Sequence, residues 1–150
     1  MNLLDAGFRL AFRLAYPMAT RWWRLVGHDG VTVAVWVQDR VLVVRHSYKP
    51  GWRLPGGGLK AREHPQSAAA RELYEEVGVR VRPDDLRVVL NLRSHYGQIY
   101  VYETCLDHEP ALTVDHREII EAAFRPPTEA AEKSTLLLDY LRHRNLPLAA

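Results

Sequence analysis

Two apolar, β-branched runs lie close together in the first third of the chain. Val31–Val37 reads VTVAVWV and Val41–His46 reads VLVVRH, with the polar triplet Gln38-Asp39-Arg40 between them. Such runs are typical of buried strands, because branched side chains pack well on a pleated surface. The pair is therefore predicted to form a β-hairpin.

A glycine-rich break followed by a helix is predicted next. Residues 56–58 are all glycine, which interrupts regular structure and lets the backbone approach a ligand closely. Pro65 is tolerated in the first turn of a helix, and Gln66–Val77 contains strong helix formers throughout. Gly78 is placed to end that helix.

The second half of the chain predicts two more strands and a last helix. Leu86–Leu92 and Ile99–Leu106 alternate well enough to be strands, with Ser94–Gly97 as their connection. Thr128 is predicted to cap a final helix that runs to about His143. Its apolar positions follow helical spacing, namely Leu136, Leu137, Tyr140 and Leu141. The order of elements predicts an α/β fold, an α/β/α sandwich with a mixed sheet.

Residues 1–26 predict an amphipathic helical extension in front of a domain over residues 27–150. Asp5, Arg9 and Arg13 recur every four residues and share one helix face, and apolar residues fill most of the rest. These charges break up the apolar stretch that a signal peptide, or a membrane span of about 20 residues, requires.

Two roles stay open for this extension. One is packing against the domain or against a second subunit, which would make a homodimer. The other is weak contact with a membrane surface, helped by Trp22 and Trp23 beside Arg21 and Arg24.

The composition restricts the kinds of binding partner to be expected. The net charge of +2 is too small for a generic nucleic-acid binder, so no nucleic-acid partner is expected. A pI near 8.8 is compatible with an anionic small ligand if the basic residues cluster. Cys105 is the only cysteine, which excludes an intrachain disulfide and favours a reducing compartment. We therefore expect a cytoplasmic protein.

The predicted central helix carries a cluster of acids. Glu72, Glu75 and Glu76 fall within about a 100° arc of one helix face. Such a run is by itself more often a solvated surface, and Arg71 can pair with Glu75. The preceding glycines and Glu63 change this balance, because hard cations such as Mg²⁺ take oxygen ligands and bind substrate phosphates alongside them.

Residues 57–79, GGLKAREHPQSAAARELYEEVGV, resemble the signature of the Nudix hydrolase family, G-x5-E-x7-R-E-U-x-E-E-x-G-U, where U is aliphatic. Every specified place is matched, by Gly57, Glu63, Arg71, Glu72, Leu73, Glu75, Glu76, Gly78 and Val79. The resemblance implies a Nudix-type sandwich and a hydrolase that cleaves a diphosphate bond in a nucleotide-like small molecule.

The resemblance also implies roles for single residues. Glu72, Glu75, Glu76 and the carbonyl of Gly56 would ligate Mg²⁺ or Mn²⁺. Glu63 and Arg71 would brace the loop that begins at Gly57 against the helix. The catalytic residues would be Glu72 and Glu76, or Glu118, because the family places its base either in the helix or in a later loop.

Substrate contacts are less defined by the pattern. Arg53 and Lys60 flank the glycines and are candidates for phosphate contact, with surface solvation as the alternative. The resemblance implies that Tyr96, at a position where family members acting on dinucleoside polyphosphates often carry a tyrosine, favours dinucleoside polyphosphates or nucleoside triphosphates over ADP-ribose. Two other functions stay open: a non-catalytic nucleotide-binding or regulatory module of the same fold, and a diphosphate isomerase, for which Cys105 is poorly placed.

Overall fold

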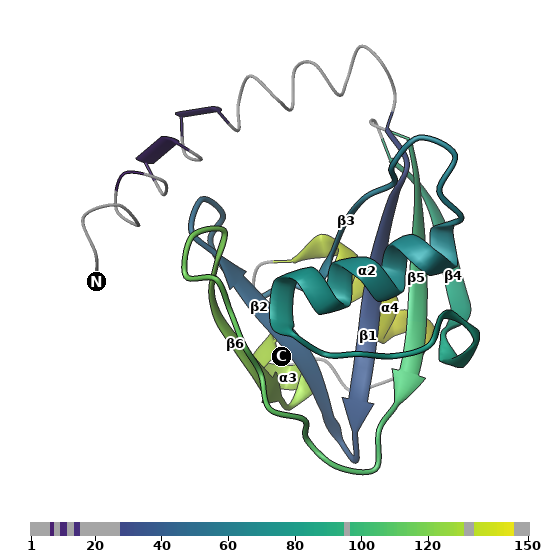
Figure 1. Cartoon of the computed structure of the whole chain (residues 1–150). Coiled ribbons are helices and arrows are strands. Elements are labelled where there is room, and N and C mark those ends of the chain that lie inside the picture. Colours follow the sequence, from purple (N-terminus) through teal and green to yellow (C-terminus); the bar gives the residue numbers. More distant parts are fainter. Residues whose placement is uncertain are drawn as a thin grey trace.

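The computed structural model describes residues 28–94, 97–130 and 134–145, together with residues 7, 10, 11, 14 and 15. Its strands are β1 (Gly30–Val37), β2 (Arg40–His46), β3 (Gly56–Gly58), β4 (Arg87–Ser94), β5 (Gly97–Cys105) and β6 (Ile119–Arg125). Its helices are α2 (Pro65–Val77), the 3₁₀ turn η1 (Pro83–Asp85), α3 (Pro127–Ala130) and α4 (Thr135–His143). Figure 1 shows α2 across one face of the sheet.

The sheet is mixed, and its central strand is β1. The strand order is β4-β5-β1-β2-β6, with β3 also paired to β1. One edge of β1 runs parallel to β5, from Gly30 opposite Ile99 to Trp36 opposite Cys105. The other edge is divided between β3 at its start and β2 at its end, both antiparallel. The predicted hairpin is therefore confirmed, but its strands pair only beside the turn.

Residues 52–55 lie between β1 and β2 where these strands diverge. The Val33 N–H donates to the Pro55 carbonyl at 2.9 Å, and Val44 and Arg53 exchange two backbone hydrogen bonds of 2.8 and 2.9 Å. This segment satisfies backbone groups that the divergence would leave unpaired. It also leads the chain directly into β3.

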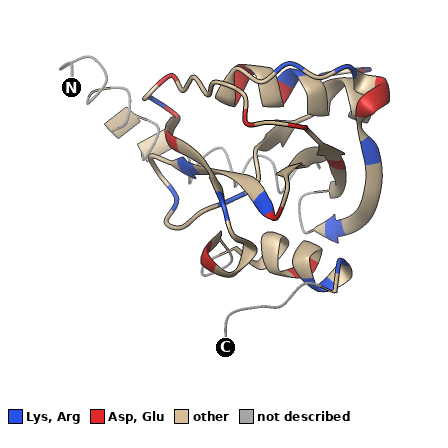
Figure 2. Cartoon of the chain, turned by 90° about the horizontal axis from the view of Figure 1, so that it is seen from below, with Lys and Arg blue, Asp and Glu red and all other residues tan. Residues whose placement is uncertain are grey.

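Alternate residues of β1 face two hydrophobic cores. Val31, Val33 and Val35 pack with the buried side of α2. Ala34 and Trp36 point to the other face and pack with α4 and Ala130. Figure 2 shows α2 on one side of the sheet and α3 and α4 on the other. The predicted α/β/α sandwich is confirmed.

Helix α2 forms close to where the sequence predicts it. Ala69, Leu73 and Val77 recur every four residues and are fully buried, which fixes the face that packs on the sheet. Gly78 adopts φ +74°, and its N–H donates to the Tyr74 carbonyl at 2.9 Å to end the helix.

Two details of the predicted elements are wrong, and one strand, at residues 119–125, was not predicted. The glycines at 56–58 form the short strand β3, because β1 offers them an unpaired edge. Ile119–Arg125 is strand β6, although its sequence IIEAAFR has no clear alternation; pairing with β2 makes it a strand. Thr128 lies within α3, and the cap of α4 is Ser134, whose hydroxyl accepts from the Leu137 N–H at 3.3 Å.

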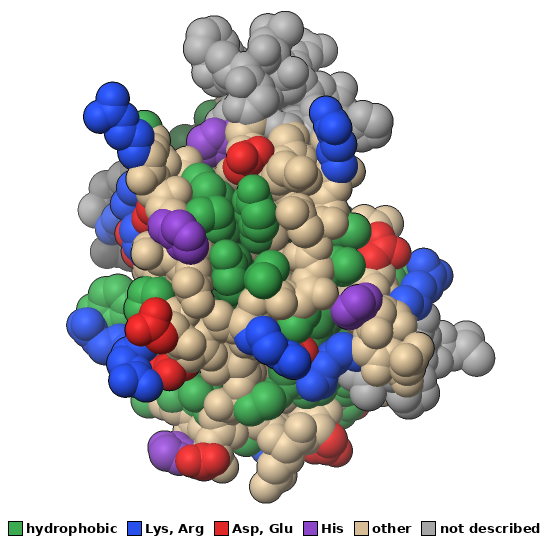
Figure 3. Space-filling model, turned by 90° about the vertical axis from the view of Figure 1, so that its right-hand side faces the viewer, with side chains coloured by type: hydrophobic (Ala, Val, Ile, Leu, Met, Phe, Trp, Pro, Cys, Tyr) green, Lys and Arg blue, Asp and Glu red, His purple; other side chains and the backbone are tan. Residues whose placement is uncertain are grey.

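The strand β4 forms one edge of the sheet. Val88 is 53% exposed on it, and Arg87 and Arg93 are exposed as well. Figure 3 shows this side of the molecule, with apolar side chains interspersed among charged ones. Charged side chains on an edge strand oppose pairing with another chain.

The predicted N-terminal extension lies mostly outside the described residues. Those that are described, at positions 7, 10, 11, 14 and 15, are helical and exposed. No helix in the described part of the chain is long and apolar enough to cross a membrane. The contacts of the N-terminal extension with a second subunit or with a membrane surface stay predictions.

A buried polar cluster attaches α4 to the sheet. The Trp36 indole N–H donates to the Tyr140 hydroxyl at 2.6 Å, and that hydroxyl donates to Glu103. Glu103, 5% exposed, also forms ion pairs with Arg144 at 2.8 Å and with Arg87 at 3.0 Å. Burial and the Glu103 hydrogen bond raise the pKa of Tyr140, so the hydroxyl stays protonated and keeps donating.

Replacing Tyr140 with Phe tests this cluster. The change leaves the Trp36 N–H and one Glu103 oxygen short of a partner in the core. We expect a loss of about 1–3 kcal/mol in the free energy of unfolding, measured by urea denaturation. Tyr74→Phe is the matched control, because the Tyr74 side chain is exposed and its hydroxyl accepts a hydrogen bond from Arg80. Equal losses for the two variants would contradict this account.

Candidate active site

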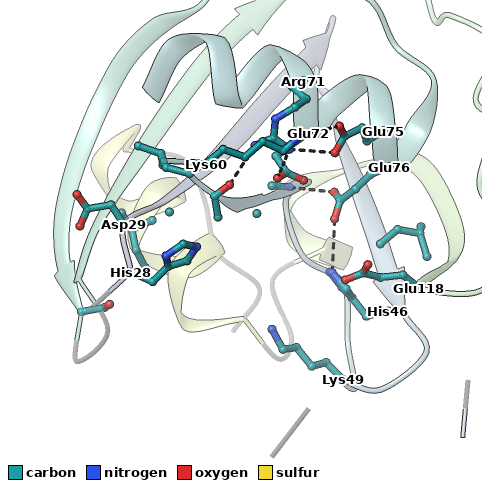
Figure 4. Close-up of a pocket in the computed structure, with 18 of the residues that line it drawn as sticks. His28, Asp29, His46, Lys49, Lys60, Arg71, Glu72, Glu75, Glu76 and Glu118 are labelled. Carbon is teal, nitrogen blue, oxygen red and sulfur yellow. Dashed lines mark hydrogen bonds and ion pairs between the residues drawn. The ribbon is translucent and has the colours of Figure 1, made fainter. Parts of the chain in front are cut away.

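A cavity of about 900 Å³ opens beside the glycine strand β3. Its walls come from β3, from the acidic side of α2, from residues after β2 and from residues before β6. Figure 4 shows the acidic side chains of α2 facing this space, with Glu118 and His46 opposite Glu76. Segments far apart in the sequence therefore meet at one site.

Two glycines of β3 are required by close contacts. A Cβ on Gly56 would lie 2.2 Å from the Val31 carbonyl, and Gly56 adopts φ +153°, which other residues rarely do. A Cβ on Gly57 would lie 2.5 Å from the carboxylate carbon of Glu72. The Gly56 N–H donates to Glu76 at 2.9 Å. The glycines thus let the acids of α2 lie directly against the strand.

Arg71 joins the loop to the helix. Its guanidinium binds both oxygens of Glu63 at 2.8 Å and donates to the Gly58 carbonyl at 3.0 Å. Its third nitrogen donates to Glu72 at 2.6 Å and to Glu75 at 2.9 Å. The hydrogen bonds from Arg71 lower the pKa of Glu63 to about 2. Glu63 is therefore an ionised partner at neutral pH.

Burial opposes the ionisation of two acids of α2. Burial raises the pKa of Glu72, and it raises the pKa of Glu76 to about 8, with Glu118 and Asp115 acting in the same direction. Burial and Lys49 lower the pKa of His46 to about 4, so it is neutral although its Nε2 lies 3.7 Å from Glu76. Such a site favours an added positive charge.

The donor set fits a hard divalent cation by its chemistry. Carboxylates of Glu72, Glu75 and Glu76 line one cavity with the backbone of Gly56, and all are oxygen ligands. As they stand, no three acidic, histidine or cysteine side chains of the described residues are arranged to hold a metal ion. Arg71 binds two of the three acids, so a cation would compete with this guanidinium for Glu72 and for the half-exposed Glu75.

The other predicted site residues divide between the cavity and its surroundings. Glu118 lines the cavity and accepts from the Tyr48 hydroxyl at 2.7 Å. Lys60 lines it too, with its Nζ 3.5 Å from Glu75. Arg53 is not among the lining residues, although its charge helps to lower the pKa of His46, which is one of them. Tyr96 lies outside the described residues.

Several lining residues were not predicted from the sequence. His28, His46 and Asp115 enter the cavity from three separate segments. No local pattern marks them, because only the sheet topology brings them together. Cys105, by contrast, ends β5 on the surface and does not line this cavity, which leaves the isomerase without a nearby thiol.

Comparison with known proteins places this site in a family. The family model for the NUDIX domain matches residues 27–146. The chain belongs to the NUDIX domain family. The matched stretch includes all of the acidic helix, the glycine strand and the sheet that carries them.

Curated relatives match less than half of this NUDIX chain. The diphosphoinositol polyphosphate phosphohydrolase 2 of Rattus norvegicus is 41% identical over 66 residues, which are 43% of this chain and 37% of the relative. The RNA pyrophosphohydrolase of Francisella philomiragia is 41% identical over 59 residues, 39% of this chain and 37% of the relative. The matches thus span little more than a third of these relatives.

Solved structures agree on the fold. A MutT NUDIX hydrolase from Burkholderia pseudomallei has a TM-score of 0.68 at 16% identity, covering 78% of this chain and 97% of that one. A bifunctional NMN adenylyltransferase/ADP ribose pyrophosphatase from Francisella tularensis, complexed with AMP and a Mn ion, has a TM-score of 0.64 at 18% identity. It covers 95% of this chain and 48% of that one. At such identities the likeness shows the fold alone.

Glu63→Gln tests the brace between loop and helix. The pKa of Glu63 is about 2 in the folded protein, against an ordinary value of 4.5. A carboxyl with a lowered pKa stabilises the fold fully above its unfolded value and loses this contribution as the pH falls toward the folded value. We expect the variant to unfold roughly 1–3 kcal/mol more easily at pH 7, with a smaller difference at pH 3, in urea titrations. A difference that is the same at both pH values would contradict this role.

Proposed function

We propose that this protein hydrolyses a phosphoanhydride bond in a nucleotide-like small molecule, with Mg²⁺ or Mn²⁺ as cofactor. The observation that carries the proposal is the meeting of Glu72, Glu75 and Glu76 with the glycine strand in one cavity. Membership of the NUDIX domain family supports it, because relatives are named as phosphohydrolases and pyrophosphohydrolases. The expected cytoplasmic location stays a prediction.

The chain's own residues account for most of the required chemistry. Attack on a diphosphate spreads negative charge over phosphoryl oxygens, so positioning and electrostatic stabilisation dominate. Glu72, Glu75, Glu76 and the Gly56 carbonyl would hold the cation, which supplies Lewis-acid stabilisation and a more acidic bound water. Lys60, which lines the cavity, would contact a phosphate, and Arg71 would hold the loop against the helix.

A carboxylate must also take a proton from the attacking water. Glu72 lies against Gly57, with its carboxylate held by Arg71 beside the other acids. Glu118 lies across the cavity and is bound to Tyr48. We favour Glu72, because it lies within the acidic cluster and burial brings its pKa toward the range of a useful base.

The alternative function is a nucleotide-binding or regulatory module without catalysis. A binding module would need the same cavity but not a cluster of buried acids. Burying carboxylates costs free energy of folding, because the charges lose their hydration. The substrate class expected from the sequence, a dinucleoside polyphosphate or a nucleoside triphosphate, stays a prediction, because it rests on Tyr96. The names of the relatives add diphosphoinositol polyphosphates and RNA as candidates.

A substrate panel with Mg²⁺ tests the proposed reaction. It includes ATP, diadenosine tetraphosphate, ADP-ribose, a diphosphoinositol polyphosphate and a 5′-triphosphorylated RNA, with release of phosphate, pyrophosphate and mononucleotide measured. We expect one compound to be cleaved efficiently, and Glu76→Gln to lower its kcat by about 10²-fold or more. Glu109→Gln is the control, because this acid pairs with Arg40 on the surface.

Two results would contradict the proposal. A Glu76→Gln variant as active as the parent would remove the acidic helix from the mechanism. A parent that binds a panel compound tightly and cleaves none of them would favour the binding module.

Glu72→Gln and Glu118→Gln separate the two candidate bases. Removal of a general base lowers kcat by about 10²–10⁴-fold. We expect this loss for Glu72→Gln and less than a tenfold loss for Glu118→Gln, measured on the best panel substrate under saturation. The reverse order would assign the base to Glu118.

A further inference from the structure

One end of the active-site cavity is formed by residues outside the family signature. His28 and Asp29, directly before β1, line the cavity with Ser94 of β4 and Ile99 of β5. Figure 4 shows His28 and Asp29 on the opposite side from Glu76 and Glu118, with Lys60 between them. This end therefore lies beyond the acids that would hold the cation.

The backbone around His28 is held from two sides. The Asp29 carbonyl accepts from the Leu59 N–H at 3.0 Å, just after β3. The Asp29 carboxylate accepts from the Gln98 N–H at 2.8 Å, at the start of β5. Asp29 thus attaches this segment to the residue that follows β3 and to strand β5.

Two glycines are packed against the same dipeptide. A Cβ on Gly97 would lie 2.7 Å from the His28 carbonyl and 2.8 Å from the Asp29 carboxylate. A Cβ on Gly58 would lie 2.4 Å from Nε2 of His28. The imidazole therefore lies directly on the glycine strand, beside Gly58. The carbonyl of Gly58 accepts a hydrogen bond from Arg71. Because the hydrogen bonds of Asp29 fix the backbone beside it, the imidazole is attached to a backbone that is ordered before a ligand arrives, which reduces the entropy lost on binding.

We propose that His28, positioned by Asp29, is a specificity-determining residue that binds the group attached to the substrate's diphosphate. The inference rests on the proposed function, which puts the diphosphate itself at Glu72, Glu75, Glu76 and Lys60. The space left at the His28 end then receives the substituent. The imidazole would donate a hydrogen bond to an oxygen or nitrogen acceptor of that group, and the apolar Ile99 would contact its carbon framework.

His28→Ala tests the contact on the best substrate of the panel. We expect KM to rise about ten- to hundredfold, as for loss of one well-placed hydrogen bond, while kcat changes by less than about threefold. His28→Gln keeps an N–H donor and should recover part of the affinity, whereas His28→Phe should not. His64→Ala is the matched control, because His64 is exposed outside the cavity.

Gly58→Ala provides a second, independent test. The added methyl group would displace the imidazole, so this variant should raise KM much as His28→Ala does. In the His28→Ala background the same methyl group meets no imidazole and should have little further effect. Additive losses from the two changes would contradict a role through His28.

Binding without turnover separates the substituent from the diphosphate. Isothermal titration calorimetry would use a methylene-bridged analogue of the best-bound panel compound, and methylenediphosphonate as the bare diphosphate. We expect His28→Ala to weaken the first about ten- to hundredfold and to leave the second within about twofold. Equal weakening of both, or no weakening of the first, would overturn the inference.

The two proposals fail in different ways. If the parent cleaves a panel compound and His28→Ala leaves KM unchanged, the specificity role is wrong and the hydrolase stands. If the parent binds a compound without cleaving it, the hydrolase is wrong, and the calorimetric comparison still decides the role of His28.

Discussion

The guanidinium of Arg71 neutralises and positions the acids on which the site depends. It binds Glu63 with two hydrogen bonds, donates to the Gly58 carbonyl and contacts Glu72 and Glu75. Only arginine offers a rigid fork with enough donors for this set, and a lysine ammonium would not span it. Because one cation holds loop, strand and helix together, the distance from the glycine strand to the acids of α2 is set by side chains within the signature itself.

The divergence of β1 and β2 gives this cluster its place. β1 pairs with β2 only near their turn, so its first residues are left to pair with β3. The glycine strand then runs beside the central strand of the sheet, below α2, where Gly57 admits the Glu72 carboxylate. A cavity at this position is consequently built beside the central strand, whose later residues are buried. Catalytic groups supported in this way lose little freedom when a substrate binds.

The two faces of the sheet are stabilised by different means. The face under α2 is held by aliphatic packing, with Leu73 and Val77 fully buried against β1. The opposite face adds the polar cluster of Trp36, Tyr140 and Glu103, which fixes how α4 lies on the sheet. Polar contacts of this kind have defined directions, whereas aliphatic contacts tolerate sliding. Because these contacts hold the helices on both faces of the sheet, the acidic side of α2 can line the cavity without taking part in the core.

The sequence by itself determined the elements and residues whose information is local. The alternation of β1 and β2, the helix that ends at Gly78 and the complete signature from Gly57 to Val79 all depend on neighbours within a few residues. The contact between Glu63 and Arg71 follows from the same short segment. Only the tertiary structure decided that the glycines form a strand, that Ile119–Arg125 pairs with β2 and that Arg53 lies outside the cavity.

The tertiary structure also decided that His28, His46 and Asp115 share the cavity with the signature acids. The physical reason is that these features depend on pairing between distant segments. The spacing of side chains does not show that β2 leaves part of β1 unpaired. Nor do the neighbours of His28 in the sequence show which strand its side chain will contact. The residues of the signature were therefore readable from one short stretch, and the other walls of the cavity were not.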